Sequence, residues 1–595
     1  MKYSEYLMRV LADEGYTHCF FVAGGNVMHL LDSASKIFEC VPFTHEHSAV
    51  VAAEYFNKTN VAASQRSFSL VTAGPGLTNA VTAIAGSWLE SRENLIIGGQ
   101  VKTADLKSQE LRQLGIQEVD GTEIVRQITK VSERLSEPVS SDKIKAFLSA
   151  GKSGRKGPVF LEVCLDVQAR ETLFEPISVS ECIELRERPV KVDQTKMAEI
   201  IELLGAARRP VFLLGGGLEQ HQVRPLIPAL EKLGVPLMTS WNGADLVPSD
   251  SPVYFGRPNT WGQRGANIIF QQADLLVAFG ARLGLQQTGF AWDEFLPLGK
   301  IVQIDIDSAE LDKKRPIVGH PVHGDALEYL QAILENLSPE LCDWAVWREF
   351  AEKTIAATGE LAENDKPQPP HIDPYAFVKD LSKNFEDSEV IIPSSSGGSF
   401  TVTMQAIDLV GSQRLISNKG LASMGYGLAG AIGASFATNS RVVLLEGDGG
   451  FLQNAQELST AAEHGLNIKI FLFSNNGYAS IRMTQQNYFD GNIVGTGKGS
   501  GLRMPSWELL ARSFGIGWSQ LGSGWQSDPE FSKNFGHELP WIFEVLIDEQ
   551  QTYFPKIGSR VETDGSMKSN PLHRMDPKMP PDLDAAMFPY LKGMQ

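Results

Sequence analysis

Cysteine is scarce in this chain of 595 residues. The five cysteines are odd in number and widely spaced, and no two of them form a CxxC motif: Cys19, Cys40, Cys164, Cys182 and Cys342. This pattern argues against a scaffold built on disulfides and against a structural zinc site, and it is typical of a protein that folds in a reducing compartment. We therefore expect a cytoplasmic protein.

Positive charge is also in short supply, since 53 Lys and Arg face 71 Asp and Glu and the formal net charge is −18. Binding to nucleic acid or to an anionic membrane surface needs an excess of Lys and Arg, so we expect neither partner. The longest stretch without charge, residues 420–440, is rich in Gly, Ala and Ser. It predicts a helix packed inside a domain rather than a membrane span. Residues 1–12 predict an amphipathic helix and not a signal peptide.

Short apolar runs that end in glycine-rich turns alternate with helical patterns along most of the chain. This alternation predicts parallel βαβ units and an α/β protein of three flavodoxin-like or Rossmann-like domains, each with a parallel sheet. Strand periodicity lapses near residues 170–190 and 340–372, which we interpret as linkers. The predicted strands lie in residues 18–23, 67–72, 94–97, 158–163, 211–217, 274–280, 300–307, 390–392, 441–450, 468–476 and 541–547.

Two polar turns in the last third of the chain carry the most specific signal. Asp448, within the sequence Glu-Gly-Asp-Gly-Gly, follows one predicted strand, and Asn475 follows the next strand 27 residues later. Ligands collect at the carboxyl edge of an open parallel sheet, and Mg²⁺ is held by a few protein oxygens together with water and phosphate. Gly449 and Gly450 let backbone N–H groups approach a phosphate. The plain alternative is two polar β-turns.

A second glycine pattern lies just upstream. Gly425, Gly427 and Gly430 match GxGxxG, and Glu446 follows at the distance that a dinucleotide-binding fingerprint requires. The residues before Gly425 make a poor strand, however, and Glu446 belongs to the Asp448 turn. Tight helix packing through small residues is therefore the preferred interpretation of these glycines.

The Asp448 and Asn475 pattern resembles the diphosphate- and metal-binding signature of the thiamin-diphosphate (ThDP) enzymes. The order of the blocks resembles the acetolactate synthase/pyruvate oxidase superfamily, in which a pyrimidine-binding domain, a central domain and a diphosphate-binding domain follow one another. The segments 99–106, 112–120 and 554–580 are similar to acetolactate-synthase-like proteins of polysaccharide and branched-sugar pathways. On this resemblance we expect the three domains of the ThDP-enzyme fold at residues 1–175, 190–340 and 370–552, and a tail at 553–595.

The resemblance implies how the cofactor is held. Asp448, Asn475 and the carbonyl of Gly477 would ligate Mg²⁺. Four residues would contact the diphosphate: Gly398, Ser399, Gly449 and Gly450. The backbone around Ala422 and Met424 would bind the aminopyrimidine, and the Met424 side chain would bend the cofactor.

The resemblance also places the catalytic acid and the substrates. The acid falls on Glu46, where it would hydrogen-bond the pyrimidine, and Gln117 would face the reacting centre. Without the resemblance, His45, Glu46 and His47 indicate only a weak metal site or a polar strand end, and the roles of the two histidines stay open. Gly24 and Gly25 are expected beside the substrate. Acetolactate synthases carry two aromatic residues against the second substrate, where this chain has Ile116 and Thr484.

Flavin binding stays open at this stage. Residues 215–217 and the Gly280-Ala281-Arg282 turn resemble an FAD-binding region, but Leu283 to Gln286 depart from the Asp-rich continuation of flavin-binding synthases. The alternative is a central domain that keeps the fold and holds no cofactor.

The function that follows is ThDP- and Mg²⁺-dependent decarboxylation of a 2-oxo acid, pyruvate above all, with transfer of the two-carbon unit to an acceptor carbonyl such as a keto-sugar. The alternatives are acetolactate synthase proper, a simple decarboxylase, an FAD-dependent oxidase and a non-catalytic relative. The resemblance further implies a homodimer or homotetramer with its active sites between subunits.

Overall fold

The computed structural model describes residues 1–60, 65–108, 110–172, 174, 191–339, 342–359, 361, 363–561 and 565–591. The chain divides into two compact units. Unit 1 holds residues 1–187, 389–400 and 416–546, and unit 2 holds residues 188–388, 401–415 and 547–595. Within unit 1 we call residues 1–169 the first block, and residues 389–400 with 416–546 the third block.

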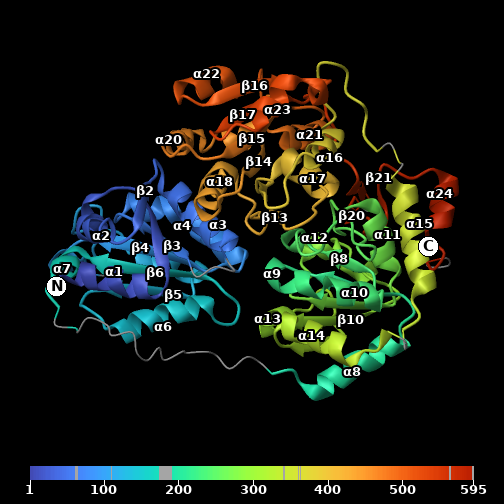
Figure 1. Cartoon of the computed structure of the whole chain (residues 1–595), viewed down its shortest axis with the longest axis horizontal. Helices are drawn as coiled ribbons and strands as arrows, with labels where there is room; N and C mark the ends of the chain where they lie inside the picture. Colours follow the sequence, from blue (N-terminus) through green and yellow to red (C-terminus); the bar gives the residue numbers. More distant parts are fainter. Residues whose placement is uncertain are drawn as a thin grey trace. The chain divides into compact units, whose positions relative to one another are not determined.

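Six parallel strands form the sheet of the first block, in the order β2-β1-β3-β4-β6-β5. Alternate residues of β4 enter different cores, because Leu95 and Ile97 pack with α1 and α6 whereas Ile96 packs with α3 and α4. Helices therefore cover both faces of the sheet (Figure 1). The elements are α1 (Tyr3–Asp13), β1 (Tyr16–Phe21), α2 (Met28–Ala34), β2 (Glu39–Pro42), α3 (Glu46–Thr59), β3 (Arg66–Val71), α4 (Pro75–Leu89), β4 (Asn94–Gln100), α5 (Gly121–Val125), β5 (Val131–Leu135), α6 (Ser141–Lys152), β6 (Pro158–Cys164) and α7 (Leu165–Ala169).

The third block repeats this design, since β12, β14, β15, β17 and β16 lie side by side in parallel in that order. This is the order that β1, β3, β4, β6 and β5 have in the first sheet. The elements are β12 (Val390–Ile392), α18 (Tyr426–Ala437), β14 (Val442–Gly447), α19 (Asp448–Phe451), α20 (Leu458–Glu463), β15 (Ile468–Ser474), α21 (Ala479–Tyr488), α22 (Trp507–Ser513), β16 (Gly517–Leu521), α23 (Pro529–Phe535) and β17 (Trp541–Leu546). Helix α17 (Gly397–Ala406) begins in this block.

The two blocks of unit 1 share one hydrophobic core, and α3 packs along α18 within it (Figure 1). A Cβ atom on Gly433 of α18 would lie 2.1 Å from the carbonyl oxygen of Ala52 on α3, so only glycine permits this approach. A buried polar group crosses the same contact, because Glu54 of α3 binds Arg92 and also Asn418 of the third block. The helix pair therefore fixes the start of α3 beside the third block.

Unit 2 contains a five-stranded parallel sheet in the order β11-β10-β9-β7-β8, which is the flavodoxin-like order 2-1-3-4-5 read from its other edge. Short strands and a helix of the C-terminal segment pack on α11, where Arg264 donates hydrogen bonds to the carbonyls of Met575 and Pro577. The elements are α8 (Gln194–Ala206), β7 (Pro210–Leu214), α9 (Gln220–Val223), α10 (Ile227–Leu233), β8 (Leu237–Thr239), α11 (Arg264–Gln272), β9 (Leu275–Phe279), α12 (Leu285–Thr288), β10 (Lys300–Asp305), α13 (Ser308–Leu311), β11 (His320–His323), α14 (Ala326–Asn336), α15 (Ala345–Gly359), α16 (Pro374–Ser382), β13 (Arg414–Leu415), β18 (Lys556–Ile557), β19 (Ser559–Val561), β20 (Met567–Ser569), β21 (Met575–Asp576) and α24 (Pro581–Met587).

The predicted α/β fold of three parallel-sheet domains is confirmed, and each predicted strand coincides with an observed one. Residues 340–372 are not a bare linker, however, because they contain α15, whose Trp347 is buried against unit 2. Much of the other predicted linker, together with Cys182, lies outside the described residues. The four described cysteines are free thiols, and Cys19 and Cys40 face each other across β1 and β2. None of the described helices combines the length and the apolar character that crossing a membrane requires.

Candidate active site

Asp448 and Asn475 lie at neighbouring strand ends, as the sequence predicts. Strands β14 and β15 pair in parallel up to Gly447 and Phe473, and each polar residue follows within two positions. The Asp448 carboxylate accepts hydrogen bonds from the backbone N–H groups of Gly449 at 2.8 Å, Asn475 at 3.1 Å and Gly477 at 3.1 Å. The turn after β15 therefore folds around the carboxylate that ends β14.

Asp448 is fully buried, and burial raises the pKa of its carboxyl to about 7 although the N–H groups act in the opposite direction. A bound cation would favour the ionised form. No group of three His, Cys, Asp or Glu side chains that could hold a metal occurs among the described residues. A cation at Asp448 would therefore need neutral oxygen ligands such as the Asn475 amide and the Gly477 carbonyl. That donor set fits Mg²⁺, which keeps waters and phosphate oxygens among its ligands.

Glycine is required at two positions of this turn. Gly477 has φ +126°, and a Cβ atom there would lie 2.4 Å from the carbonyl oxygen of Thr496. A Cβ atom on Gly449 would lie 2.5 Å from the ring of Tyr478. The backbone N–H groups around Asp448 are thus held in a close loop that a side chain would displace.

Helix α17 begins beside this loop. Its first residues are Gly397, Gly398 and Ser399, and the Ser399 hydroxyl oxygen lies 3.6 Å from the position that a Cβ of Gly447 would occupy. The N-terminal ends of α17 and α19 therefore both carry backbone N–H groups at the end of β14, and such N-termini favour an anion. Gly450 follows Gly449 within α19. This arrangement fits the diphosphate contacts expected of Gly398, Ser399, Gly449 and Gly450.

The backbone expected beneath the aminopyrimidine has an unusual conformation. Ala422 has φ +57°, a left-handed conformation that residues other than glycine seldom adopt and that is common at ligand sites. The next residue, Ser423, accepts a hydrogen bond from the Ser395 hydroxyl through its carbonyl, which anchors the segment to the loop after β12. Met424 remains 37% exposed. Its side chain is therefore available to a ligand.

Glu46 is the first residue of α3 and is 8% exposed. Its Oε2 atom accepts a hydrogen bond from the Asn79 amide at 3.0 Å. Its neighbours in sequence bind the third block, since the Thr44 hydroxyl donates to Glu457 at 2.8 Å and His47 contacts Asn454. Glu46 is therefore placed where the first block meets the third.

His47 has a structural role in this contact. The Asn454 amide nitrogen donates one hydrogen to the Gly425 carbonyl at 2.7 Å and the other to Nδ1 of His47 at 3.0 Å. Nδ1 must then be an acceptor, which requires an imidazole that is unprotonated at that nitrogen. Burial lowers the pKa of His47 to about 4, in agreement with this neutral form. No described contact assigns a comparable role to His45.

Gly24 and Gln117 meet at the turn that follows β3. A Cβ atom on Gly24 would lie 2.4 Å from Cβ of Thr72, and one on Gly74 would lie 2.3 Å from the Gln117 carbonyl oxygen. Gln117 itself has φ +62°. The same turn continues to Gly76, where an added Cβ would lie 3.5 Å from Oε1 of Glu46. The turn therefore connects the surroundings of Gln117 to those of Glu46.

Ile116 projects from a loop that a single buried carboxylate organises. Glu118 accepts backbone hydrogen bonds from Lys107 at 2.6 Å, Leu114 at 2.9 Å and Gly115 at 3.0 Å, and these lower the pKa of its carboxyl against the effect of burial. Ile116 is 85% exposed. The Glu118 carboxylate thus holds the backbone of the loop together, while the Ile116 side chain at its tip remains exposed to solvent.

Thr484 lies on the exposed face of α21 together with Ile481 and Tyr488. Its hydroxyl donates a hydrogen bond to the Ser480 carbonyl at 3.0 Å, so the oxygen presents lone pairs and no hydrogen to its surroundings. The approach of Ile116 and Thr484 to a common acceptor pocket stays a prediction.

Comparison with known proteins agrees with this geometry. Three family models match the chain: the N-terminal TPP binding domain of thiamine pyrophosphate enzymes at residues 1–124, their central domain at 197–333 and their C-terminal TPP binding domain at 396–545. Together these matches cover more than half of the chain. This chain belongs to the thiamine pyrophosphate enzymes. Thiamine pyrophosphate is another name for thiamin diphosphate (ThDP). ThDP is therefore the cofactor of the family.

Several relatives are similar over nearly the whole chain. The probable acetolactate synthase large subunit of Methanocaldococcus jannaschii is 28% identical over 563 residues, which are 92% of this chain and 92% of the relative. The large subunit of acetolactate synthase isozyme 1 of Escherichia coli is 28% identical over 93% of this chain and 95% of its own length. The chloroplastic acetolactate synthase of Arabidopsis thaliana is 28% identical over 94% of this chain and 83% of its own length.

Packing within the central domain of this thiamine pyrophosphate enzyme explains why its turns at residues 215–217 and 280 contain glycine. A Cβ on Gly215 would lie 2.3 Å from the Gly280 carbonyl oxygen, and one on Gly217 would lie 2.9 Å from Cα of Gly280. The two turns therefore press directly against each other, and this packing alone accounts for the glycines. The upstream GxGxxG pattern is likewise a packing feature, because Gly427 and Gly430 of α18 touch Glu446 and Tyr55.

The sequence did not reveal the residues that hold the candidate catalytic residues in place. Asn79 binds Glu46, Asn454 and Glu457 tie α3 to the third block, and Glu118 orders the Gln117 loop. Each is a single polar residue within a helix or a turn, which a sequence alone does not distinguish from a solvated side chain. Asn454 and Glu457 bind residues more than 400 positions away, so only the fold identifies them, whereas the partners of Glu118 lie within 11 positions of it.

Proposed function

We propose that this enzyme uses ThDP and Mg²⁺ to decarboxylate a 2-oxo acid, pyruvate above all, and transfers the two-carbon unit to the carbonyl of a larger, more polar acceptor such as a keto-sugar. One observation carries the proposal: Asp448 with its loop of N–H groups and Glu46 at the start of α3 belong to the same unit, on blocks that pack together. A ThDP enzyme needs both a diphosphate anchor and a carboxyl at the pyrimidine.

In this proposal Asp448, the Asn475 amide and the Gly477 carbonyl hold Mg²⁺. The starts of α17 and α19 bind the diphosphate through Gly398, Ser399, Gly449 and Gly450. The bound cofactor supplies the electron sink that stabilises the carbanion left when a 2-oxo acid loses CO₂. The residues of the chain hold the cofactor in place, Asp448 provides the negative charge for the cation, and Glu46 provides a proton.

Glu46 would exchange a proton with the pyrimidine ring of the bound cofactor. Asn79 donates to Oε2, which leaves Oε1 to carry the proton that is shared with the pyrimidine ring. At 8% exposure the carboxyl is largely shielded from water, and a shielded general acid exchanges its proton with the partner it faces. Gly24, Gly25 and Gln117 frame the adjoining turn, where Gly25 has open space around it and room for a substrate.

The proposed preference for a larger acceptor substrate depends on the side chains of Ile116 and Thr484. Both are exposed, and neither is as large as the aromatic residues that acetolactate synthases carry at the matching positions. Apolar crowding favours a small 2-oxo acid by about 1–3 kcal/mol for each methylene in contact, so its loss favours a larger acceptor. The lone pairs of the Thr484 hydroxyl suit the hydroxyl groups of a sugar. The second candidate is acetolactate synthesis from two pyruvates, which the names of the relatives favour.

Product analysis tests the proposal. Holoenzyme is incubated with pyruvate alone and with pyruvate plus a panel of aldehydes, ketones and keto-sugars, and the products are identified by mass spectrometry. A kcat/KM for a keto-sugar acceptor at least tenfold above that for pyruvate as acceptor supports the proposal. Acetolactate as the dominant product in every mixture establishes the second candidate. Free acetaldehyde in place of a ligation product indicates a simple decarboxylase, and O₂ consumption by a yellow protein indicates a flavin oxidase.

We also propose that the enzyme is a homodimer or homotetramer, as the resemblance implies. The structure pairs the first and third blocks within one chain, whereas the resemblance implies sites between subunits. Mixing two impaired variants, Glu46→Gln and Asp448→Ala, after separate unfolding and joint refolding, at a ThDP concentration that does not saturate Asp448→Ala, distinguishes these arrangements. Sites within one chain leave every mixed oligomer as impaired as the separate variants. Sites between subunits restore activity, because one site of each mixed pair then carries neither substitution.

A further inference from the structure

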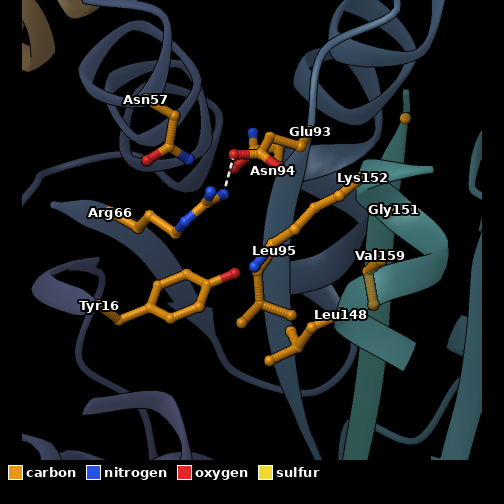
Figure 2. A pocket seen from close by; sticks show the side chains of 11 residues that line it. Tyr16, Asn57, Arg66, Glu93, Asn94, Leu95, Leu148, Gly151, Lys152 and Val159 are labelled. Carbon is orange, nitrogen blue, oxygen red and sulfur yellow. Dashed lines mark hydrogen bonds and ion pairs between the residues drawn. The ribbon is translucent and has the colours of Figure 1, made fainter. Parts of the chain in front are cut away.

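A charged cavity lies at the amino-terminal edge of the first sheet, the edge opposite to the strand ends that carry the candidate active site. It measures about 150 Å³ and adjoins a smaller one of about 10 Å³, whose lining Figure 2 shows. The two share Asn57, Arg66, Glu93 and Lys152. A single water needs about 10–15 Å³, so the larger cavity has room for a ligand of several heavy atoms. The remaining residues that line it are Asn60, Gln65 and Lys156.

Cations outnumber anions in this cavity. Arg66, Lys152 and Lys156 line it, whereas Glu93 is its single acidic lining residue. Arg66 forms an ion pair with Glu93 through Nη1, as Figure 2 shows. Lys152 forms an ion pair with Glu14 at 3.7 Å, and Glu14 also forms one with Lys145 at 3.7 Å. Burial and the positive charge of Arg66 together lower the pKa of Lys152, and the nearby acids only partly oppose them. An anion in the cavity would relieve this repulsion.

The cavity also contains a buried hydrogen-bond donor, on Asn60, for which the described residues provide no acceptor. The Nδ2 atom of Asn60 is buried and has no hydrogen-bond partner among the described residues. Asn57 provides the contrast, since its amide is fully engaged with Ser67 at 2.8 and 3.1 Å. A buried donor without an acceptor is uncommon in proteins and calls for a ligand or an ordered water. Asn60 follows α3, Arg66 begins β3 and Lys152 ends α6, so three separate parts of the first block contribute donors to the lining of the cavity.

We infer that this cavity binds a phosphoryl group, either as free phosphate or as the phosphate of a small ester. Three cationic side chains line the cavity against one acidic one, and a phosphate carries a charge of about −1.5 to −2 near neutral pH. A guanidinium, an ammonium and an amide N–H that line one cavity suit a tetrahedral anion better than a planar carboxylate. The site is separate from the cofactor's own diphosphate site, which lies in the third block.

Titration of the holoenzyme tests the inference. The enzyme is saturated with ThDP and Mg²⁺ beforehand, so that the phosphate site of the cofactor is filled. Inorganic phosphate and glycerol 3-phosphate are titrated separately by calorimetry against sodium chloride of equal ionic strength. The variant is Lys152→Gln, and the matched control is Lys143→Gln, which removes an exposed lysine from the same helix α6. The melting temperature of each variant reports whether it is folded.

We expect phosphate to bind one site per chain in the parent enzyme and in Lys143→Gln, and to bind Lys152→Gln about tenfold or more weakly. Binding of glycerol 3-phosphate with similar affinity shows that esters fit, and its failure restricts the ligand to free phosphate. The inference is overturned if phosphate binds no better than chloride, or if both variants lose affinity equally. If Lys152→Gln does not fold, Asn60→Ala takes its place and must weaken binding in the same assay. None of these outcomes depends on which acceptor the enzyme uses.

Discussion

Arg92 is buried beside two carboxylates, Glu54 and Glu90, at the contact between the first and third blocks, and removing this cation should weaken the whole of unit 1. Glu54 is 0% exposed and accepts hydrogen bonds from Arg92 at 2.6 Å, Ser87 at 2.9 Å and Asn418 at 3.2 Å. Arg92 also donates to the Ser417 carbonyl. The substitution Arg92→Met keeps an unbranched apolar stem but leaves the Glu54 carboxylate with neutral donors only.

The magnitude follows from what Arg92→Met leaves behind. Breaking a buried pair by removing one partner costs about 3–5 kcal/mol, because the other charge stays buried without compensation. At about 2 °C for each kcal/mol in a large folding unit, the melting temperature should fall by roughly 6–10 °C. The exposed pair between Arg126 and Glu123 is the matched control, and Arg126→Met should change stability by less than about 1 kcal/mol.

The same variant should make stability depend on pH in a defined direction. Burial raises the pKa of Glu54, and Arg92 opposes that rise. Without Arg92 the pKa rises further, so above the ordinary pKa of a carboxyl the folded chain holds a proton that the unfolded chain has released. Stability then falls as pH rises through this window, by about 1.36 kcal/mol for each pH unit. The loss relative to the parent should therefore be larger at pH 7.5 than at pH 5.

Calorimetric melting at both pH values measures these effects. The double variant Arg92→Met with Glu54→Gln removes the buried charge and keeps an acceptor for Ser87 and Asn418, so it should recover at least half of the lost stability. The reasoning is refuted if Arg92→Met melts within 2 °C of the parent at pH 7.5. An equal loss at both pH values, or no recovery in the double variant, would refute it as well.

Three further predictions concern the site itself. Glu46→Gln should keep the fold and ThDP binding but slow turnover by roughly 10²–10⁴-fold in steady-state assays, and near-normal turnover would remove Glu46 from the mechanism. Asp448→Ala should weaken Mg²⁺-dependent ThDP binding at least about tenfold, because the carboxylate that faces the loop N–H groups is gone; unchanged affinity in titration calorimetry would contradict that role. Thr484→Trp should lower kcat/KM for a bulky ketone acceptor by about tenfold or more relative to pyruvate, with Thr484→Ser as a control that keeps the hydroxyl, and unaltered selectivity would place the acceptor elsewhere.

Local sequence was enough to predict the most apolar strands of the three sheets, whereas β2, β5, β8, β11 and β16 were not predicted. Runs such as residues 442–445 are fully apolar because parallel strands are buried on both faces, and that property is visible without a fold. The position of Asp448 beside Asn475 followed for the same reason, since consecutive parallel strands end at one edge. The sequence did not predict α15 within an expected linker, nor the short strands of the C-terminal segment.

Tertiary structure alone decided which distant residues support the site. The contacts of Thr44 with Glu457 and of His47 with Asn454 join residues more than 400 positions apart, and no local pattern predicts such a pairing. The same holds for the cavity at Arg66 and Lys152, whose charges are brought together by the start of a strand and the end of a helix. Secondary structure depends on side chains a few residues apart, which a sequence displays directly. The pKa of a buried group and the convergence of donors depend on distance in space, which only the packed chain defines.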